Sequence, residues 1–183
     1  MTPPTPLARG VSVAAAILVL AACGSPDGRV AADLAADERW TAVQAALEVR
    51  RGLSRELTSQ ARARAPSEGV TLALQALDDA RLRTSGMPMS RDDLADPSKT
   101  SAWQKAQSTL AHARRALARA AEATELEERL DVADRDFAAA VARYTAAATA
   151  YDDLLRTAGL DANPLTGRRF LPRVAFATTA SGD

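Results

Sequence analysis

Two long stretches of this 183-residue chain contain no proline, and they limit the chain to a narrow set of folds. No proline occurs between Pro26 and Pro66, and after Pro97 there is no glycine before Gly159 and no proline before Pro164. Proline and glycine are the residues that most disfavour a helix interior. Aromatic residues make up only 4 % of the chain, whereas strands favour aromatic and β-branched residues. The sequence therefore predicts an all-α fold.

Apolar residues spaced three and four apart predict a first helix over residues 29–64 and a second over about 67–83. Ser67 is the expected N-cap of the second helix. Within the first helix, Arg50 interrupts the apolar stripe, and Gly52 costs the helix about 1 kcal/mol relative to alanine. We expect Gly52 to mark a close contact with another helix.

Residues 84–100, "TSGMPMSRDDLADPSKT", hold one glycine and two prolines and predict a surface loop. Ser98 or Thr100 is the expected cap of the helix that follows.

Two further apolar stripes follow, up to residue 158, and they form either one very long helix or two helices. The capping-box pattern Thr124-Glu125-Leu126-Glu127 favours a turn near Ala123. Four helices joined by short links predict an up-and-down antiparallel four-helix bundle over residues 29–158, with long first and last helices. Residues 159–183 form an irregular tail, in which "RRFLPRVAF" is expected to pack on the bundle and "TTASGD" to be disordered.

The first 22 residues are typical of a signal peptide. The apolar run from Val11 to Ala22 rises only about 18 Å as a helix, well short of the roughly 30 Å hydrocarbon core of a membrane. Leu20-Ala21-Ala22-Cys23 resembles the lipobox of bacterial lipoproteins, in which the cysteine is acylated and becomes the first mature residue. We expect a lipoprotein signal peptide over 1–22, lipidation at Cys23 and a tether over 23–28. The alternative is an ordinary secretory peptide with an incidental cysteine.

Cys23 is the one cysteine of the chain, so its acylation would leave no thiol for a disulfide, a nucleophile or a metal ligand. Lys and Arg number 23, as do Asp and Glu, and removal of residues 1–22 takes away Arg9 and no acidic residue. A mature net charge near −1 argues against a nucleic-acid-binding protein, which would show a basic excess.

Two segments resemble the LemA family. "RRGLSREL" (50–57) resembles a stretch late in that family's first helix, and "ARYTAAATAYDDLL" (142–155) resembles its tyrosine-containing signature, with Tyr144 and Tyr151 seven residues apart. Thr145 and Asp152 stand where the family has asparagine, and the lipobox replaces a transmembrane helix that is common in the family. The resemblance implies a helical bundle facing the outside of the cytoplasmic membrane. It implies no particular chemistry, because no biochemical role is established for the family.

Arg50, Tyr144 and Tyr151 are the candidate binding residues, because all three lie on apolar stripes and carry polar groups that need partners when buried. They form either an internal polar site, or a snorkelling arginine and two ordinary core tyrosines. Three arginines, Arg114, Arg115 and Arg119, either pair with the acidic face of the next helix (Glu127, Asp131 and Asp134) or face water.

The sequence offers no catalytic or metal-ligating set. His112 is the lone histidine and has no partners spaced for catalysis or metal binding, and the chain contains no P-loop, dinucleotide-binding turn, nucleophile elbow or HExxH. We expect a lipid-anchored binding or scaffold protein of the cell envelope, with the membrane and an envelope protein as partners and without cofactor or identifiable small-molecule substrate. The alternatives are an envelope hydrolase or metal-dependent enzyme that uses helix-face carboxylates, and a purely structural spacer.

Overall fold

The computed structural model describes residues 26–64, 67–158 and 170–176, and these form an all-helical protein with no strand. The four helices are α1 (Pro26–Ala63), α2 (Glu68–Ser85), α3 (Pro97–Ala120) and α4 (Thr124–Ala158), and a short 3-10 helix, η2 (Asp93–Ala95), precedes α3. The predicted all-α fold and the number of helices are confirmed.

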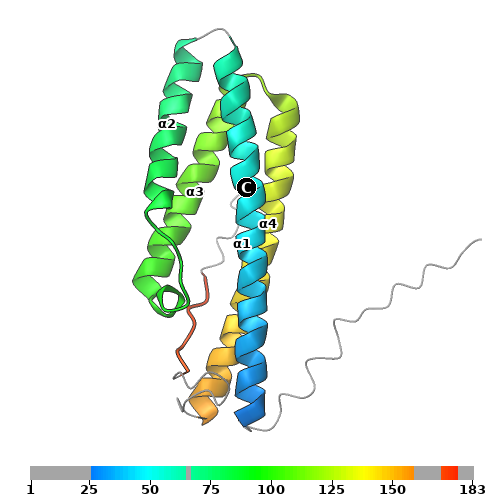
Figure 1. Ribbon diagram of the computed structural model, residues 1–183, viewed down its shortest axis with the longest axis vertical. Helices are drawn as coiled ribbons and strands as arrows, with labels where there is room; N and C mark the ends of the chain where they lie inside the picture. Colours follow the sequence, from blue (N-terminus) through cyan, green and yellow to red (C-terminus); the bar gives the residue numbers. More distant parts are fainter. Residues whose placement is uncertain (1–25, 65–66, 159–169, 177–183) are drawn as a thin grey trace, which may run out of the picture.

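The helices lie side by side in two pairs (Figure 1). The long helices α1 and α4 pack mainly on each other, and the shorter α2 and α3 form the second pair. Residues 170–176 then run across the lower half of the molecule without regular structure.

The predicted turn near Ala123 is confirmed. α3 ends at Ala120, and α4 begins at Thr124. Glu122 adopts a left-handed backbone conformation with φ of 48°, and the amide of Ala123 donates to the carbonyl of Ala118 at 2.8 Å. This is the arrangement by which a left-handed residue ends a helix and satisfies its last carbonyls.

Of the two predicted N-caps, one is right. The Ser67 hydroxyl accepts a hydrogen bond from the Val70 amide at 3.2 Å and caps α2 as expected. The cap of α3 is Asp96, not Ser98 or Thr100, because its carboxylate accepts from the Ser98 amide at 2.8 Å. Pro97 suits the first helical position, where no backbone donor is needed.

Residues 86–96 do not form a purely exposed loop. Leu94 in η2 is completely buried, and its carbonyl accepts a hydrogen bond from the Val174 amide at 2.7 Å. The apolar side chain and this bond attach the loop to the segment 170–176, in which Phe170, Arg173 and Phe176 are buried. The expected packing of this part of the tail is confirmed, whereas "TTASGD" lies outside the described residues.

The core has a leucine-rich part, an aromatic part and a smaller third part that includes Tyr151 and Phe170. Leu57, Leu77, Leu117 and Leu130 are completely buried in the first, towards the end where α1 meets α2 and α3 meets α4. The second groups aromatic side chains from α1, α3, α4 and the C-terminal segment, namely Trp40, Trp103, Tyr144 and Phe176.

Gly52 does not mark a close helix contact, contrary to expectation. A Cβ atom at this position would meet no atom within 4 Å.

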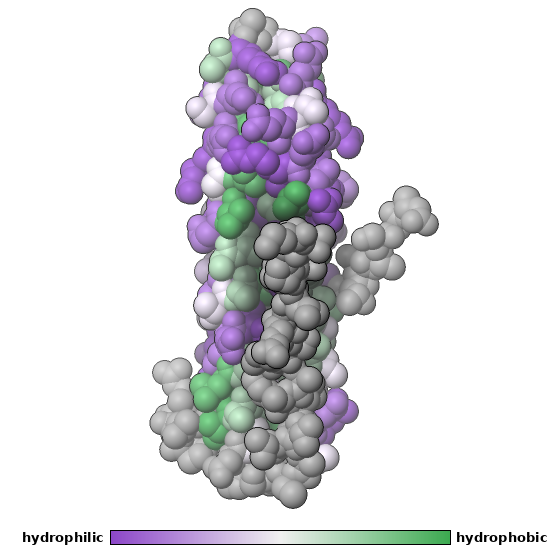
Figure 2. Space-filling model, turned by 90° about the vertical axis from the view of Figure 1, so that its right-hand side faces the viewer, coloured by the Kyte–Doolittle hydropathy of each residue, from purple (hydrophilic) through white to green (hydrophobic). Residues whose placement is uncertain are grey.

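None of the helices described between residues 26 and 158 has the length and apolarity needed to cross a membrane. On the face shown in Figure 2, hydrophilic residues dominate the upper part, and hydrophobic residues reach the surface at mid-height and below. The signal peptide, the tether and Cys23 fall outside the described residues, apart from 26–28.

Candidate functional site

The leucine-rich and aromatic parts of the core meet at a cluster of buried charge. Arg50 of α1 is 3 % exposed and Arg114 of α3 is 1 % exposed. Both face Asp134 of α4: the Nε of Arg50 lies 2.8 Å from Oδ1 of Asp134, and Nη2 of Arg114 donates to the same oxygen at 3.0 Å. One carboxylate oxygen therefore serves two buried guanidinium groups.

A third arginine completes this cluster. Arg115 donates from Nη2 to Oδ2 of Asp134 at 3.0 Å and from Nε to Oδ1 of Asp131 at 3.2 Å. Arg119, one turn further on, donates to Glu127 at 2.8 Å. Of the two alternatives that the sequence left open for these arginines, the structure shows the pairing with the acidic face of the next helix.

The charges of the cluster do not balance, because Arg50, Arg114 and Arg115 face only two aspartates. Burial lowers the pKa of Arg50, although the charge and hydrogen bonding of Asp134 oppose the shift. Burial, followed by the charge of Arg50, lowers the pKa of Arg114 to about 10. Guanidinium groups stay charged at neutral pH, so the fold carries a buried positive charge without a full counter-charge.

Three of the buried donors in this cluster form no hydrogen bond, and one of them, Nε of Arg50, is still in ion-pair contact with Asp134. Nη1 of Arg50 and Nε of Arg114 form no hydrogen bond with any side chain or backbone group of the described residues. Arg50 instead places its guanidinium over the ring of Phe137, 4.1 Å from the ring centroid. A buried N–H without an acceptor costs about 1–3 kcal/mol, more when the donor is charged.

A pocket of about 350 Å³ opens beside this cluster, between α1, α2 and α3. Its lining has five arginines and no acidic residue: Arg50, Arg51, Arg55, Arg81 and Arg114. Four uncharged polar residues add to it: Ser54, Thr84, Ser85 and Gln107. The shared carboxylate of Asp134 is not part of this lining; it lies on the other side of Arg50.

A second pocket of about 380 Å³ lies on that other side, between α3 and α4. Trp103, Phe137 and Val141 give it a more apolar lining, and Asp134 is on its wall. Arg50 and Gln107 line both pockets and separate them.

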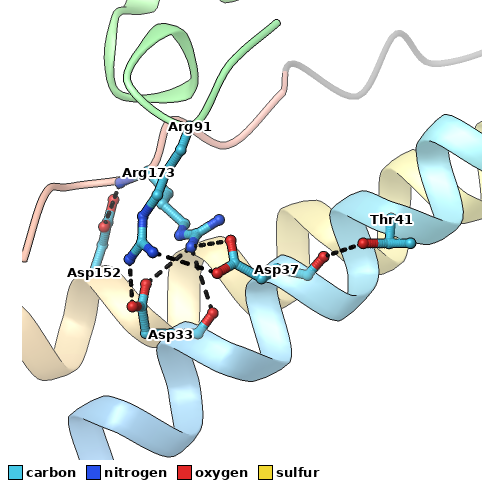
Figure 3. Close-up of polar contacts among 6 residues, drawn as sticks. All are labelled: Asp33, Asp37, Thr41, Arg91, Asp152 and Arg173. Atoms are coloured by element: carbon cyan, nitrogen blue, oxygen red, sulfur yellow. Dashed lines mark hydrogen bonds and ion pairs between the residues drawn. The ribbon is translucent and has the colours of Figure 1, made fainter. Parts of the chain in front are cut away.

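A separate polar cluster attaches the C-terminal segment to the first turns of α1 (Figure 3). Nη2 of Arg173 donates to Oδ1 of Asp33 at 2.9 Å and also bonds Asp37. Arg91, from the loop before η2, pairs with the same two aspartates. The backbone amide of Arg173 donates to Asp152 of α4 at 2.8 Å, so four parts of the chain meet here.

The two tyrosines lie near this second cluster. Both side chains are completely buried, and the Arg173 guanidinium lies 5.6 Å from the ring centroid of Tyr151. Burial raises the pKa of Tyr144 to about 12, and the nearby Arg173 opposes the shift. Burial, together with the charge of Asp33, raises the pKa of Tyr151 to about 12 as well.

The three candidate residues are therefore all buried but divide between two clusters. Arg50 contacts Asp134 and Phe137, whereas Tyr151 lies beside Arg173 and Phe170. The structure adds Arg114, Asp134 and Arg173 as residues of buried polar clusters. The sequence indicated the burial of Arg114, because this residue lies four positions after Leu110 on the buried stripe. It gave no such indication for Arg173, which lies in a segment without periodicity.

His112 is exposed, and the described residues hold no group of three or more His, Cys, Asp or Glu side chains placed to bind a metal ion. No protein-family model matches the chain, and neither a curated protein nor a solved structure is significantly similar to it.

Proposed function

We propose that this chain is a lipid-anchored binding protein of the bacterial cell envelope, similar to LemA proteins, and that it acts without catalysis. We further propose that its four helices form an up-and-down antiparallel bundle. In this arrangement the pocket between α1, α2 and α3 is the recognition site.

The lining of that pocket is the observation on which the binding function rests. It presents guanidinium and amide donors but no carboxylate, histidine or cysteine. Its hydroxyl groups have no base beside them, since Ser54 donates to the Arg50 carbonyl at 2.8 Å and Ser85 to the Leu82 carbonyl at 2.8 Å. Covalent catalysis by a hydroxyl needs an adjacent base. Such a pocket is suited to holding a ligand.

The carboxylates on the face of α4 also favour a binding function over catalysis. Asp131 and Asp134, which an envelope hydrolase or metal-dependent enzyme could use, are both bonded to arginine. A guanidinium within hydrogen-bond distance of a carboxylate repels a metal cation, so these carboxylates are poorly placed to bind one.

The proposed location is supported by the lipobox-like Leu20-Ala21-Ala22-Cys23 and is tested by membrane fractionation. Wild-type chain should incorporate radiolabelled fatty acid and sediment with membranes. Cys23→Ala should lose the label and accumulate as uncleaved precursor, because acylation precedes cleavage in lipoprotein maturation. Ser25→Ala, two residues away, is the matched control and should behave as wild type. A Cys23→Ala chain that matures to the wild-type size would overturn the anchor.

A further inference from the structure

We infer that the arginine-lined pocket between α1, α2 and α3 binds a small phosphorylated molecule through Arg50 and Arg114. The inference rests on the proposed binding function and assigns that site its class of ligand. Four observations lead to it: the uncompensated charge, the unused donors, the directions from which the arginines come and the size of the pocket.

The buried positive charge of the site favours the binding of an anion. Arg50 and Arg114 share one oxygen of Asp134, and burial lowers the pKa of both groups. Burying a cation without a full counter-charge is costly, and a ligand anion within hydrogen-bond distance would supply that charge. Asp134 does not line this pocket, so it would not repel the anion directly.

Two buried donors beside the pocket are unbonded, and both belong to guanidinium groups. Nη1 of Arg50 and Nε of Arg114 have no acceptor among the described residues. The hydroxyl protons of the lining are already used: Ser54 donates to the carbonyl of Arg50, and Thr84 donates to that of Arg81 at 2.9 Å. A ligand that only accepts hydrogen bonds fits this set of donors best, and an oxyanion is such a ligand.

The arginines come from three helices. Arg50 and Arg55 belong to α1, Arg81 to α2 and Arg114 to α3. A planar carboxylate is satisfied by one or two guanidinium groups, whereas the oxygens of a tetrahedral phosphoryl group point in several directions and can accept from three sides. Arg55 makes no ion pair within the described residues, and Arg81 makes only a 3.7 Å pair with Asp78 on its own helix.

The pocket is larger than a phosphate ion. Its volume of about 350 Å³ corresponds to roughly ten water molecules at about 30 Å³ each. Leu47 and Leu110 contribute an apolar part of the wall beside the arginines. The site therefore has room for a phosphate ester with a small organic body.

The phosphoryl group could belong to a soluble molecule or to a lipid headgroup. Arg50 lies 24 residues after Pro26, which is about 36 Å along an α-helix. With a lipid on Cys23, the pocket is thus far from the end of α1 that faces the membrane, and a soluble ester is the favoured source.

Isothermal titration of the purified full-length chain with glycerol 3-phosphate tests the inference. We expect saturable binding of one molecule per chain, with glycerol and acetate inactive at matched ionic strength. Arg114→Gln should weaken binding by about tenfold or more, as expected for the loss of a charged hydrogen bond. This variant should still fold, because Asp134 keeps Arg50 and Arg115. Arg55→Gln, on the rim, changes no ion pair and should weaken binding by about threefold.

Arg119→Gln is the matched control, because it removes the same charge from the same helix at an exposed site outside the pocket. Its affinity should equal that of wild type. Equal affinities for all three variants, or no saturable binding, would overturn the inference. Binding to phosphatidylglycerol vesicles but not to the soluble ester would overturn the soluble source. Hydrolysis of the ester would overturn the proposed non-catalytic function but not the proposed phosphate site. A Cys23→Ala chain that matures to the wild-type size would overturn only the proposed location.

Discussion

The Arg173 guanidinium lies 2.9 Å from the Asp33 carboxylate, and both side chains are 2 % exposed. This ion pair joins the segment after α4 to the first turns of α1 (Figure 3). Because the pair is shielded from water, the loss of one partner leaves a buried charge behind, which is far more costly than the loss of a surface pair.

Arg173→Met should therefore destabilise the protein by about 3 kcal/mol, although methionine retains much of the apolar stem. Arg91 still faces Asp33 and limits the loss. Urea unfolding followed by circular dichroism measures the effect. Arg156→Met is the control, because Arg156 is 73 % exposed and pairs with Asp153 on its own helix. Its cost should stay below about 1 kcal/mol. Equal costs would show that the C-terminal segment does not stabilise the fold.

Stability should fall steeply above pH 10. The pKa of Tyr144 and that of Tyr151 are both raised to about 12 in the fold, from an ordinary value of 10. Above pH 10 the unfolded chain loses the phenolic protons and the folded chain keeps them, so the stabilisation present below pH 10 is lost as the pH approaches 12. Each tyrosine should contribute about 1.4 kcal/mol per pH unit.

Urea unfolding at pH 10, 11 and 12 measures this slope. Tyr151→Phe should roughly halve the tyrosine contribution, and the double variant with Tyr144→Phe should remove it, leaving the parts due to Lys99 and Arg114. The chain has only two tyrosines, so the ultraviolet absorbance of phenolate follows them directly. Phenolate absorbance at pH 10 from the still folded chain would contradict the burial of both hydroxyls.

Leu117→Ala should destabilise the protein by about 2–5 kcal/mol, because a completely buried leucine leaves a cavity when truncated. Leu82→Ala is the matched control at a side chain that is 74 % exposed, and its effect should be within about 0.5 kcal/mol. Thermal and urea unfolding of the two variants compare the sites. A cost below about 0.5 kcal/mol for Leu117→Ala would place the stripe of α3 on the surface.

Gly52→Ala should stabilise the protein by about 1 kcal/mol, the difference in helix propensity between the two residues. An added Cβ would meet no atom within 4 Å, so no steric cost offsets the gain. The reverse change at an exposed site of the same helix, Ala45→Gly, should destabilise by a similar amount. A loss of stability in Gly52→Ala would reveal a contact that this structure does not contain.

The helices could be predicted from the sequence because each one carries a periodic apolar stripe and ends at a recognisable break. The turn at Ala123 followed from the capping box, and the cap at Ser67 from its position after Pro66. Asp96 was missed as the cap of α3 because three residues close together can all serve as caps, and only the position of the first turn decides between them.

The partners of the buried polar groups were harder to predict. The pairing of Arg114 with Asp134 follows from two helices that are adjacent in the chain. The position of Arg50 opposite Asp134 depends on the axial register of α1 against α4, which no local pattern encodes. Arg173 lies in a segment without periodicity, so nothing in the sequence indicated that it reaches Asp33, 140 residues away.

The pairing of the four helices is nested, since α2 and α3 pack together inside the sequence interval that separates α1 from α4. Contacts between segments close in sequence form at a smaller loss of chain entropy than contacts between distant ones. The α2–α3 pair can therefore form while the chain is still incomplete, whereas α1 makes most of its contacts only once α4 is present. Until then most of the apolar stripe of α1 stays exposed on the nascent protein.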